Sequence, residues 1–173
     1  KLHIDIDAPR AVFIVETNRE KDGTELEKVR SLFHGKSHDF VTAVDEKNII
    51  VVHELMDGEG YEDLYRTAEV IRSLFGGAGN QEVHIAYGSI VKEIKEVSRS
   101  YKEARMALDV GKIFFEDKGI IAYAALGIGR LIYQLPIPLC KMFIKEIFGG
   151  RSPDDFDEET LMTINKFFEN NLN

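Results

Sequence analysis

Short apolar runs and amphipathic stretches alternate along the first half of the chain, and their order restricts the possible folds more than any other feature. Residues 24–33 and 61–75 repeat apolar side chains every three or four positions, which is typical of helices. Strands are predicted for four runs rich in β-branched and aromatic residues, namely 11–16, 40–44, 49–55 and 83–87. The order β-α-β-β-α-β predicts an α+β, ferredoxin-like fold with these helices on one face of a mostly antiparallel sheet.

The second half of the chain is dominated by helical patterns. Apolar side chains from Ile94 to Ile113 repeat at helical spacing, Gly119 interrupts the pattern, and residues 120–123 form a further strand candidate. Extra C-terminal helices are predicted at 126–135, 138–148 and 158–168.

The composition excludes several classes of protein. The net charge of the 173 residues is −8, so the chain is poorly suited to holding nucleic-acid phosphates through bulk charge. Cys140 is the one cysteine, which excludes an internal disulfide and fits a reducing cytosol. No apolar run reaches the roughly 20 residues that span a bilayer. We therefore expect a cytoplasmic protein with no membrane partner and, because Lys1 stands where an initial Met would, a fragment of a longer polypeptide.

Two glycine-rich stretches have some features of phosphate loops, but their positions favour structural roles. Gly76-Gly77-Ala78-Gly79 follows a predicted helix, whereas a phosphate loop leads into the N-terminus of a helix. We interpret this cluster as a helix C-cap and turn. Gly127 and Gly129 open a helical run, but the third glycine and the downstream acid of a dinucleotide-binding motif are missing. Packing at the start of a helix explains them better.

The histidines and the acidic cluster do not form a recognisable reactive site. His34 and His38 lie near a predicted loop, and His53 and His84 lie in predicted strands, where framework roles are expected. The acidic residues in 154–159 miss the spacing of a calcium loop and suit the start of a helix. No Ser-His-Asp arrangement can be drawn. We therefore predict no catalytic, cofactor-binding or metal-binding residues.

Three stretches, in order, resemble bacterial transcriptional regulators of the PucR and CdaR-like (carbohydrate diacid regulator) type. Residues 100–111 (SYKEARMALDVG) resemble their SYxEAxxALxxG helix, and residues 126–136 (LGIGRLIYQLP) are similar to the next landmark. Residues 160–173 resemble the helix that opens their C-terminal helix-turn-helix domain. The signature residues, expected to be structural, are Ser100, Tyr101, Glu103, Ala104, Ala107, Leu108, Gly111, Leu126, Gly127, Arg130 and Leu131.

Packing roles follow for these signature residues. We expect Tyr101, Ala104 and Leu108 to bury one side of the first signature helix, and Ala107 and Gly111 to allow close packing. In the next landmark we expect burial of Leu126, Leu131 and Leu135, and an ion pair or interface contact for Arg130.

The resemblance implies a central GGDEF-like domain, a relative of nucleotide cyclase domains that has usually lost the cyclase chemistry. The GGDEF signature occupies the hairpin turn, where Asp45 and Glu46 replace the two glycines that let the backbone approach a nucleotide. Lys47 and Asn48 replace the two acids that hold divalent cations. Glu16 remains as a single candidate metal acid, and one carboxylate does not make a two-metal site. We therefore predict that the chain is not an enzyme.

The resemblance also implies the domain organisation and the role. We expect a residual linker (1–10), a GGDEF-like domain (11–125), a helical extension (126–150), and a linker with the first helix of a truncated helix-turn-helix domain (151–173). The expected role is regulation and dimerisation, linking an N-terminal effector-sensing module to a C-terminal DNA-binding domain. A homodimer is expected. Operator DNA would be contacted through the missing C-terminal domain, and a sugar diacid or similar effector through the missing N-terminal one.

An alternative stays open at this point. It is a degenerate cyclase domain that has kept a pocket for sensing a nucleotide or another small ligand, with Lys47 near a phosphate and Glu16 near a metal ion. A stand-alone ferredoxin-like enzyme is disfavoured, because no nucleophile or acid–base pair can be assigned.

Overall fold

The computed structural model describes residues 6–17, 24–33, 38–75, 83–114 and 118–136, and a few positions between 138 and 146. The chain divides into two compact units, residues 1–126 and residues 127–173, and each is described by itself.

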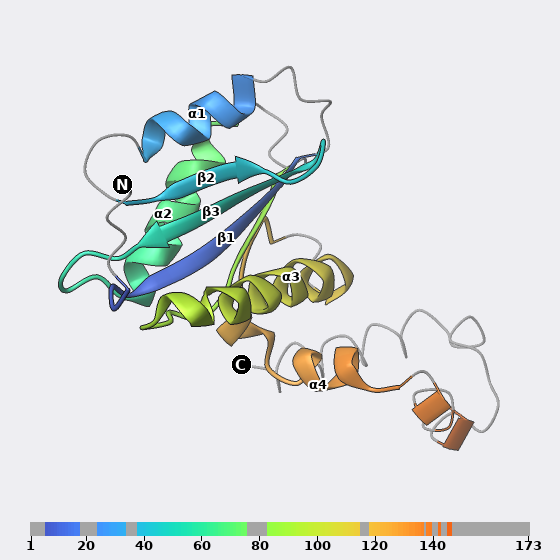
Figure 1. Cartoon of the computed structure of the whole chain (residues 1–173). Helices are drawn as coiled ribbons and strands as arrows, with labels where there is room; N and C mark the ends of the chain where they lie inside the picture. The colour runs from blue at the N-terminus through green and yellow to red at the C-terminus, as the bar shows by residue number, and fades with distance from the viewer. Residues whose placement is uncertain are drawn as a thin grey trace. The chain divides into compact units, whose positions relative to one another are not determined.

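The described strands form one five-stranded sheet in the order β2-β3-β1-β4-β5 (Figure 1). The central strand β1 (Arg10–Thr17) pairs antiparallel with β3 (Asn48–Glu54) and with β4 (Val83–Tyr87). β2 (Phe40–Ala43) is antiparallel to β3, and β5 (Ile120–Ala122) is parallel to β4. The sequence-based prediction of an α+β, ferredoxin-like fold is therefore confirmed, including the hairpin between β2 and β3.

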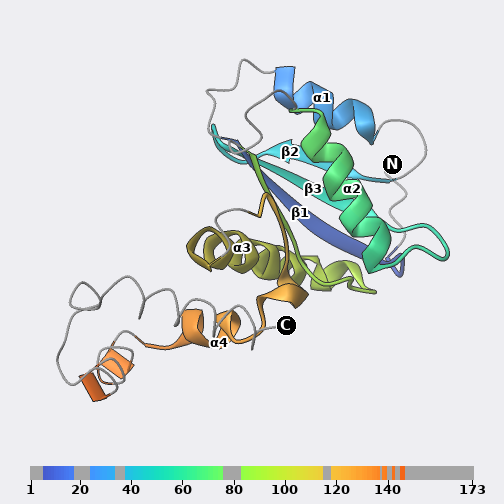
Figure 2. The same ribbon diagram turned by 180° about the vertical axis from the view of Figure 1, so that it is seen from behind.

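Helices cover both faces of this sheet (Figures 1 and 2). α1 (Thr24–Leu32) and α2 (Tyr61–Ser73) pack on one face, as predicted. α3 (Val97–Phe114) follows the short helix η2 (Ile94–Glu96) and packs on the other face. All eight residues of β1 are buried, because alternate side chains of a strand point to opposite faces and here both faces are covered.

The face under α1 and α2 is filled by large side chains. Phe13 and Val15 of β1 belong to one buried cluster with Leu64, Ala68 and Ile71 of α2. The three α2 residues lie three or four positions apart, so they fall on one side of the helix. Burial of each large aliphatic side chain stabilises the fold by roughly 1.5–3 kcal/mol.

The face under α3 is packed through small side chains. Ala104, Ala107 and Leu108 are fully buried against Val12 and Ile14 of β1. The predicted close approach is confirmed most clearly at Gly111 of the same helix: a Cβ atom added there would lie 1.9 Å from Cδ1 of Ile121.

Ser100 joins α3 to the sheet by two hydrogen bonds. Its hydroxyl accepts a hydrogen bond from the Val12 amide at 3.0 Å and donates one to the Ser89 carbonyl at 2.8 Å. The backbone of Ser100 also approaches Gly88 so closely that a Cβ atom there would lie 2.1 Å from the Ser100 carbonyl oxygen. The side chain is fully buried, so the signature serine has a structural role, as expected.

The burial predicted for Tyr101 is wrong. Tyr101 is 36% exposed, whereas Ser100, one position earlier and about 100° around the helix, is fully buried. The buried side of α3 is the one that carries the small signature residues, and the tyrosine lies beside it. Tyr65 belongs to the apolar repeat of residues 61–75 in α2, yet it is likewise 47% exposed.

The predictions for the second landmark are partly wrong. Leu126 is buried, but it ends the short helix η3 (Tyr123–Leu126) and does not belong to the next helix. Gly127 has φ of +52°, which separates η3 from α4 (Gly129–Gln134). Leu131 is 65% exposed and Leu135 is 45% exposed, so the burial predicted for both is wrong.

Several sequence-based predictions concern residues outside the described ones, namely Gly76–Gly79, His34, 154–159 and 158–168. Among the described helices, none is both long and apolar enough to cross a membrane.

Candidate functional site at the hairpin end of the sheet

Three polar side chains lie next to each other where β1 ends. Glu16 of β1 pairs directly with Asn48 of β3 on one side and with His84 of β4 on the other. Because residues two apart on a strand share a face, Glu16 lies on the same face as Ile14, under α3. The sequence identified Glu16 and Asn48, and the sheet brings them together.

The carboxylate of Glu16 forms an ion pair with the ammonium of Lys112 in α3. The Glu16 side chain is only 10% exposed and that of Lys112 is 39% exposed. The charge of Glu16 is therefore compensated by the protein itself. Lys112 was not predicted from the sequence, although it directly follows Gly111, which brings this part of α3 close to the sheet.

The hairpin turn is closed by a side chain. The carboxylate of Asp45 accepts hydrogen bonds from the backbone amides of Lys47 at 2.7 Å and Asn48 at 2.8 Å, and from the side-chain amide of Asn48 at 2.8 and 2.9 Å. The Val44 amide donates to the Asn48 carbonyl at 3.1 Å. No residue of this fully described turn has a positive φ, so Asp45 provides the closure without any glycine.

The backbone also fixes the turn against the central strand. The amide of Thr17 donates to the carbonyl of Lys47 at 2.9 Å. Asp45, Glu46 and Lys47 are exposed, while Asn48 is only 8% exposed. The turn is therefore held in place by hydrogen bonds, and it presents exposed polar side chains next to the ion pair of Glu16 and Lys112.

Two buried polar atoms in this region have no hydrogen-bond partner among the described residues, namely Oδ1 of Asn48 and Nδ1 of His84. Leaving such a group unpaired costs about 1–3 kcal/mol. This end of the sheet is therefore polar, and some of its buried polar atoms lack hydrogen bonds, in contrast to the apolar core beside it.

These residues do not fit a pair of divalent cations. Glu16 already faces the Lys112 ammonium, and the position opposite it is the neutral Asn48. The carboxylate of Asp45 is engaged by the turn itself. Among the described residues, no group of three or more histidine, cysteine or acidic side chains is placed to hold a metal ion.

Two signature residues of α3, Ser100 and Glu103, lie at the other end of β4. The carboxylate of Glu103 accepts a hydrogen bond from the Ser89 amide at 2.8 Å, and the Ser100 hydroxyl donates to the carbonyl of the same residue. Both contacts hold the loop after β4 against α3. Arg130, in the second unit, donates from Nε to the Gly127 carbonyl at 3.4 Å.

Of two histidines considered in the sequence, His53 is largely buried and His38 is exposed. Nδ1 of His53 lies 3.1 Å from Asp39, and its ring contacts Phe13 and Phe33. Nδ1 of His38 lies 3.3 Å from Glu54. These contacts agree with the framework role predicted for His53, whereas the same prediction for His84 fails in one respect, because its buried Nδ1 has no hydrogen-bond partner among the described residues.

Comparisons with known proteins give a family match and a similar solved structure. The chain matches the family described as "GGDEF-like domain" over residues 1–110. That match names neither a transcriptional regulator nor a helix-turn-helix region. A solved structure, that of the active GGEEF domain of a diguanylate cyclase from Vibrio cholerae, is similar with a TM-score of 0.44 and 17% identity, covering 67% of this chain and 83% of that one. No curated protein matches the chain.

Proposed function

The chain belongs to the GGDEF-like domain family, and we propose that it is a non-catalytic member: a regulatory and dimerisation domain of a PucR/CdaR-like transcriptional regulator. One observation carries the non-catalytic part. The side chains at the positions where a cyclase would bind its metal ions and nucleotide are already engaged within the protein. Lys112 pairs with Glu16, and Asp45 closes the turn.

The chemical reason lies in the charges at the hairpin. Cyclisation of a nucleotide needs hard cations against the phosphates, and such cations need several carboxylates. A cation beside Glu16 would face the ammonium of Lys112, which repels it. Freeing the Asp45 carboxylate would cost the hydrogen bonds that close the turn.

A relay role fits the packing of α3. This helix is held to the sheet by small side chains and by the two hydrogen bonds of Ser100, which favours movement of α3 together with the sheet. A rigid element of this kind transmits a bias between an effector-sensing module and a DNA-binding module. The coupling free energy between such modules is typically about 1–3 kcal/mol.

The partners of the proposed role follow from charge and symmetry. With a net charge of −8, the chain itself is not suited to operator DNA, which would be bound by a C-terminal helix-turn-helix domain. A sugar diacid or similar effector would be bound by an N-terminal module. Two-fold operators favour a homodimer.

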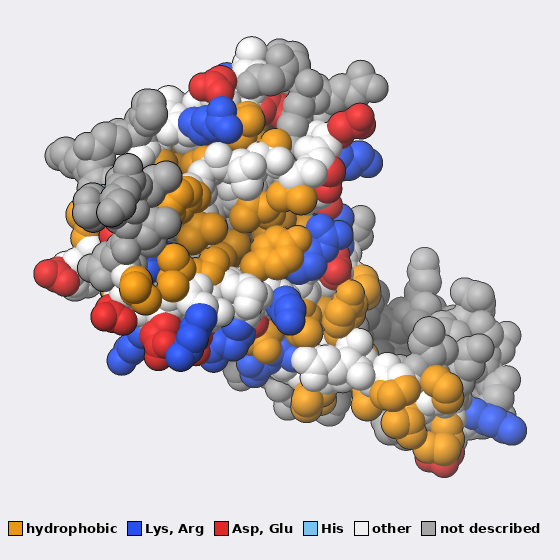
Figure 3. Space-filling view, viewed as in Figure 1, with side chains coloured by type: hydrophobic (Ala, Val, Ile, Leu, Met, Phe, Trp, Pro, Cys, Tyr) orange, Lys and Arg blue, Asp and Glu red, His pale blue; other side chains and the backbone are white. Residues whose placement is uncertain are grey.

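An apolar surface over the β2–β3 hairpin suits such a dimer. Figure 3 shows apolar side chains over the sheet between α1 and α3. Phe40, which pairs with Val52 on the α3 side of the sheet, is 39% exposed, and Val44 is 59% exposed. We expect this surface to face a second copy of the chain.

Two measurements test the proposal. Purified protein incubated with GTP and Mg²⁺ or Mn²⁺ is expected to form no cyclic dinucleotide by chromatography and mass spectrometry, with an active diguanylate cyclase as the positive control. Sedimentation velocity is expected to show a dimer that Phe40→Glu weakens and that Val70→Glu, on the exposed side of α2, leaves unchanged. Product formation would refute the non-catalytic assignment, and a monomer at high concentration would refute the dimer.

The alternative function, a degenerate cyclase domain that senses a nucleotide, has one specific observation in its favour. Lys47 is exposed on the turn and accessible to a phosphate. A thermal-shift panel of GTP, cyclic dinucleotides and small diacids, with and without Mg²⁺, separates the two proposals. A ligand at 100 times its dissociation constant adds about 2.7 kcal/mol of stability, and loss of that gain in Lys47→Met would favour the alternative.

A further inference from the structure

We propose that His53 and Glu59 form a proton-dependent latch, in which a protonated His53 ties strand β3 to the loop that leads into α2. This loop comprises residues 55–60, between the end of β3 and the first residue of α2. The inference goes beyond the proposed relay role, because it concerns the face of the sheet under α1 and α2 and involves neither the hairpin turn nor α3.

Both ring nitrogens of His53 face carboxylates. Nδ1 lies 3.1 Å from Oδ1 of Asp39, and Nε2 lies 3.8 Å from Oε2 of Glu59. A neutral imidazole carries a hydrogen on only one nitrogen, whereas an ionised carboxylate only accepts hydrogen bonds. Either neutral tautomer therefore points a lone pair at a carboxylate, and only the charged imidazolium can donate to both.

The two carboxylates are held in place by backbone amides. Asp39 accepts a hydrogen bond from the Glu54 amide at 2.7 Å, and its side chain is only 1% exposed. Glu59 accepts one from the Met56 amide at 2.7 Å, within the loop itself. Nδ1 of His53 is within hydrogen-bond distance of Asp39, whereas 3.8 Å is too long for a hydrogen bond to Glu59. Protonation adds a donor at this second nitrogen, and the loop then closes toward β3.

The surroundings of the ring compensate a positive charge. The His53 side chain is 13% exposed, so a charge there is costly unless partners offset the loss of water. Asp39 and Glu59 supply negative charge on both sides of the ring. The ring of Phe33, whose centroid is 5.8 Å away, adds an aromatic surface of the kind that attracts cations. Histidine ordinarily changes its charge between about pH 5 and 8, so the latch operates in that range.

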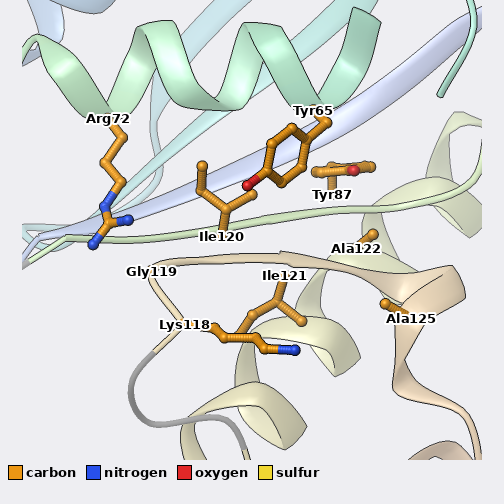
Figure 4. A pocket seen from close by; sticks show the side chains of 9 residues that line it. All are labelled: Tyr65, Arg72, Tyr87, Lys118, Gly119, Ile120, Ile121, Ala122 and Ala125. Carbon is orange, nitrogen blue, oxygen red and sulfur yellow. The ribbon is translucent and has the colours of Figure 1, made fainter. Parts of the chain in front are cut away.

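Two other titratable groups near the latch are distinguishable from it. Glu54, the next residue of β3, points to the opposite face of the sheet, where it pairs with Arg10 and with the exposed His38. From β4, the Tyr87 ring contacts Phe13, which also contacts the latch histidine. Tyr87 lines a cavity of about 540 Å³ along β5 (Figure 4). Burial raises the pKa of its phenol above the ordinary value of 10.0, so Tyr87 stays neutral in the range of the latch.

The test is a pH titration of the ¹⁵N-labelled 173-residue chain by nuclear magnetic resonance, between about pH 5.5 and 8. We expect the backbone amides of Glu59 and Gly60 in the loop to shift with one common midpoint. The imidazole signals of His53, followed in the same samples, are expected to shift with that same midpoint.

Matched variants show whether the latch is responsible. Glu59→Gln keeps the size of the side chain and removes its charge, and it is expected to abolish the titration of the loop amides. His53→Gln is expected to do the same. His38→Gln removes the exposed histidine at the same end of the sheet and is expected to leave the loop titration unchanged. If His53→Gln does not fold, Glu59→Gln gives the readout alone, because its side chain is 32% exposed.

Thermal unfolding gives a second measurement. The protonated ring gains the Glu59 carboxylate as a partner in the folded state only, so this contribution is present at the acid end of the range and is lost as the pH rises. The melting temperature of the wild type should therefore exceed that of Glu59→Gln by more at the acid end than at the alkaline end.

Three results would overturn the proposal: loop amides that do not titrate over this range, a loop titration that persists unchanged in Glu59→Gln, or one that His38→Gln removes. None of these results bears on the relay proposal, which depends on the hairpin turn and on α3. Conversely, cyclase activity or a monomeric chain would leave the latch standing.

Discussion

The two faces of the central sheet are packed by different means. Under α1 and α2, large side chains such as Phe13, Leu64 and Ile71 fill the space between layers. Under α3, alanines and Gly111 let the helix lie close to the strands, and the hydroxyl of Ser100 adds a hydrogen bond to the strand backbone. The packing of the first face depends on the apolar area that large side chains bury. The packing of the second face depends more on the close approach of α3 to the strands and on the hydrogen bonds of Ser100.

The difference predicts how much change each face tolerates. Large side chains tolerate modest repacking, because neighbours can move into a space. A helix packed closely through small residues leaves less room, so we expect substitutions that add volume on this side of α3 to be tolerated poorly. The ion pair of Lys112 and Glu16 lies on this second face, next to the hairpin turn.

The largest expected effect tests the first face. Ile71→Ala removes a fully buried side chain of α2 and is expected to lower the free energy of unfolding by about 2–5 kcal/mol. Val70→Ala, at the neighbouring position that is 45% exposed, is expected to change it by less than about 0.5 kcal/mol. Equal effects in urea denaturation would show that α2 does not pack as described.

Overpacking tests the second face. Gly111→Ala places a methyl group against Ile121 and is expected to destabilise the domain by about 1–3 kcal/mol, although alanine favours helices. Ile121→Val in the same chain, which shortens the side chain at the point of contact, is expected to restore part of the loss. A more stable Gly111→Ala protein would contradict the close approach of α3.

The hydrogen bonds of the second face are tested by Ser100→Ala. The Val12 amide and the Ser89 carbonyl lose their partner, with an expected cost of about 1–3 kcal/mol. Ser98→Ala, on the exposed side of the same helix, serves as the control and is expected to be neutral. Hydrogen exchange of the Val12 amide should accelerate in Ser100→Ala alone.

A smaller effect is expected at the ion pair. Lys112→Met leaves the Glu16 carboxylate without its cation, and we expect a loss of up to about 1 kcal/mol, since Lys112 is partly exposed and solvent screens the pair. Lys102→Met, on the exposed side of α3, is the control. A more stable Lys112→Met protein would indicate that the pair does not form in solution.

The smallest effect concerns alkaline pH. Because burial raises the pKa of Tyr87 in the folded state, the neutral phenol contributes stability below the unfolded pKa of about 10, and this contribution is lost as the pH rises through the folded pKa. Thermal unfolding between pH 9 and about 11 should therefore decline more steeply in the wild type than in Tyr87→Phe. Tyr101→Phe should follow the wild type.

The periodicity of the chain predicted the core domain well, and the structure shows where that approach fails. Strands β1, β3 and β4 and helix α2 were found within one or two residues of their ends. Tyr101 and Leu131 were assigned to buried sides because large apolar residues usually lie inside, yet both are exposed. The side of α3 that faces the sheet is the one on which small residues let the helix backbone approach the strands closely.

The hairpin site could be predicted in part. The replacement of glycines and acids by Asp45, Glu46, Lys47 and Asn48 was visible in the sequence and led to the expectation of a non-catalytic domain. The hydrogen bonds of Asp45 to its own turn are local, and an aspartate two or three residues before the amides it caps is a known signal for them. Lys112 lies 96 positions from its partner Glu16, and no pattern in the sequence connects the two.

The amino-acid sequence alone determined the order of the elements, the ferredoxin-like fold and the loss of the signature residues at the turn, because these depend on periodicity and on residue types close together in the chain. Tertiary structure decided the second layer under α3, the pairing of Lys112 with Glu16 and the cavity between α2 and β5. Each of these joins segments far apart in the sequence, and their positions are set by the packing of backbone and small side chains, which leaves no periodic signal.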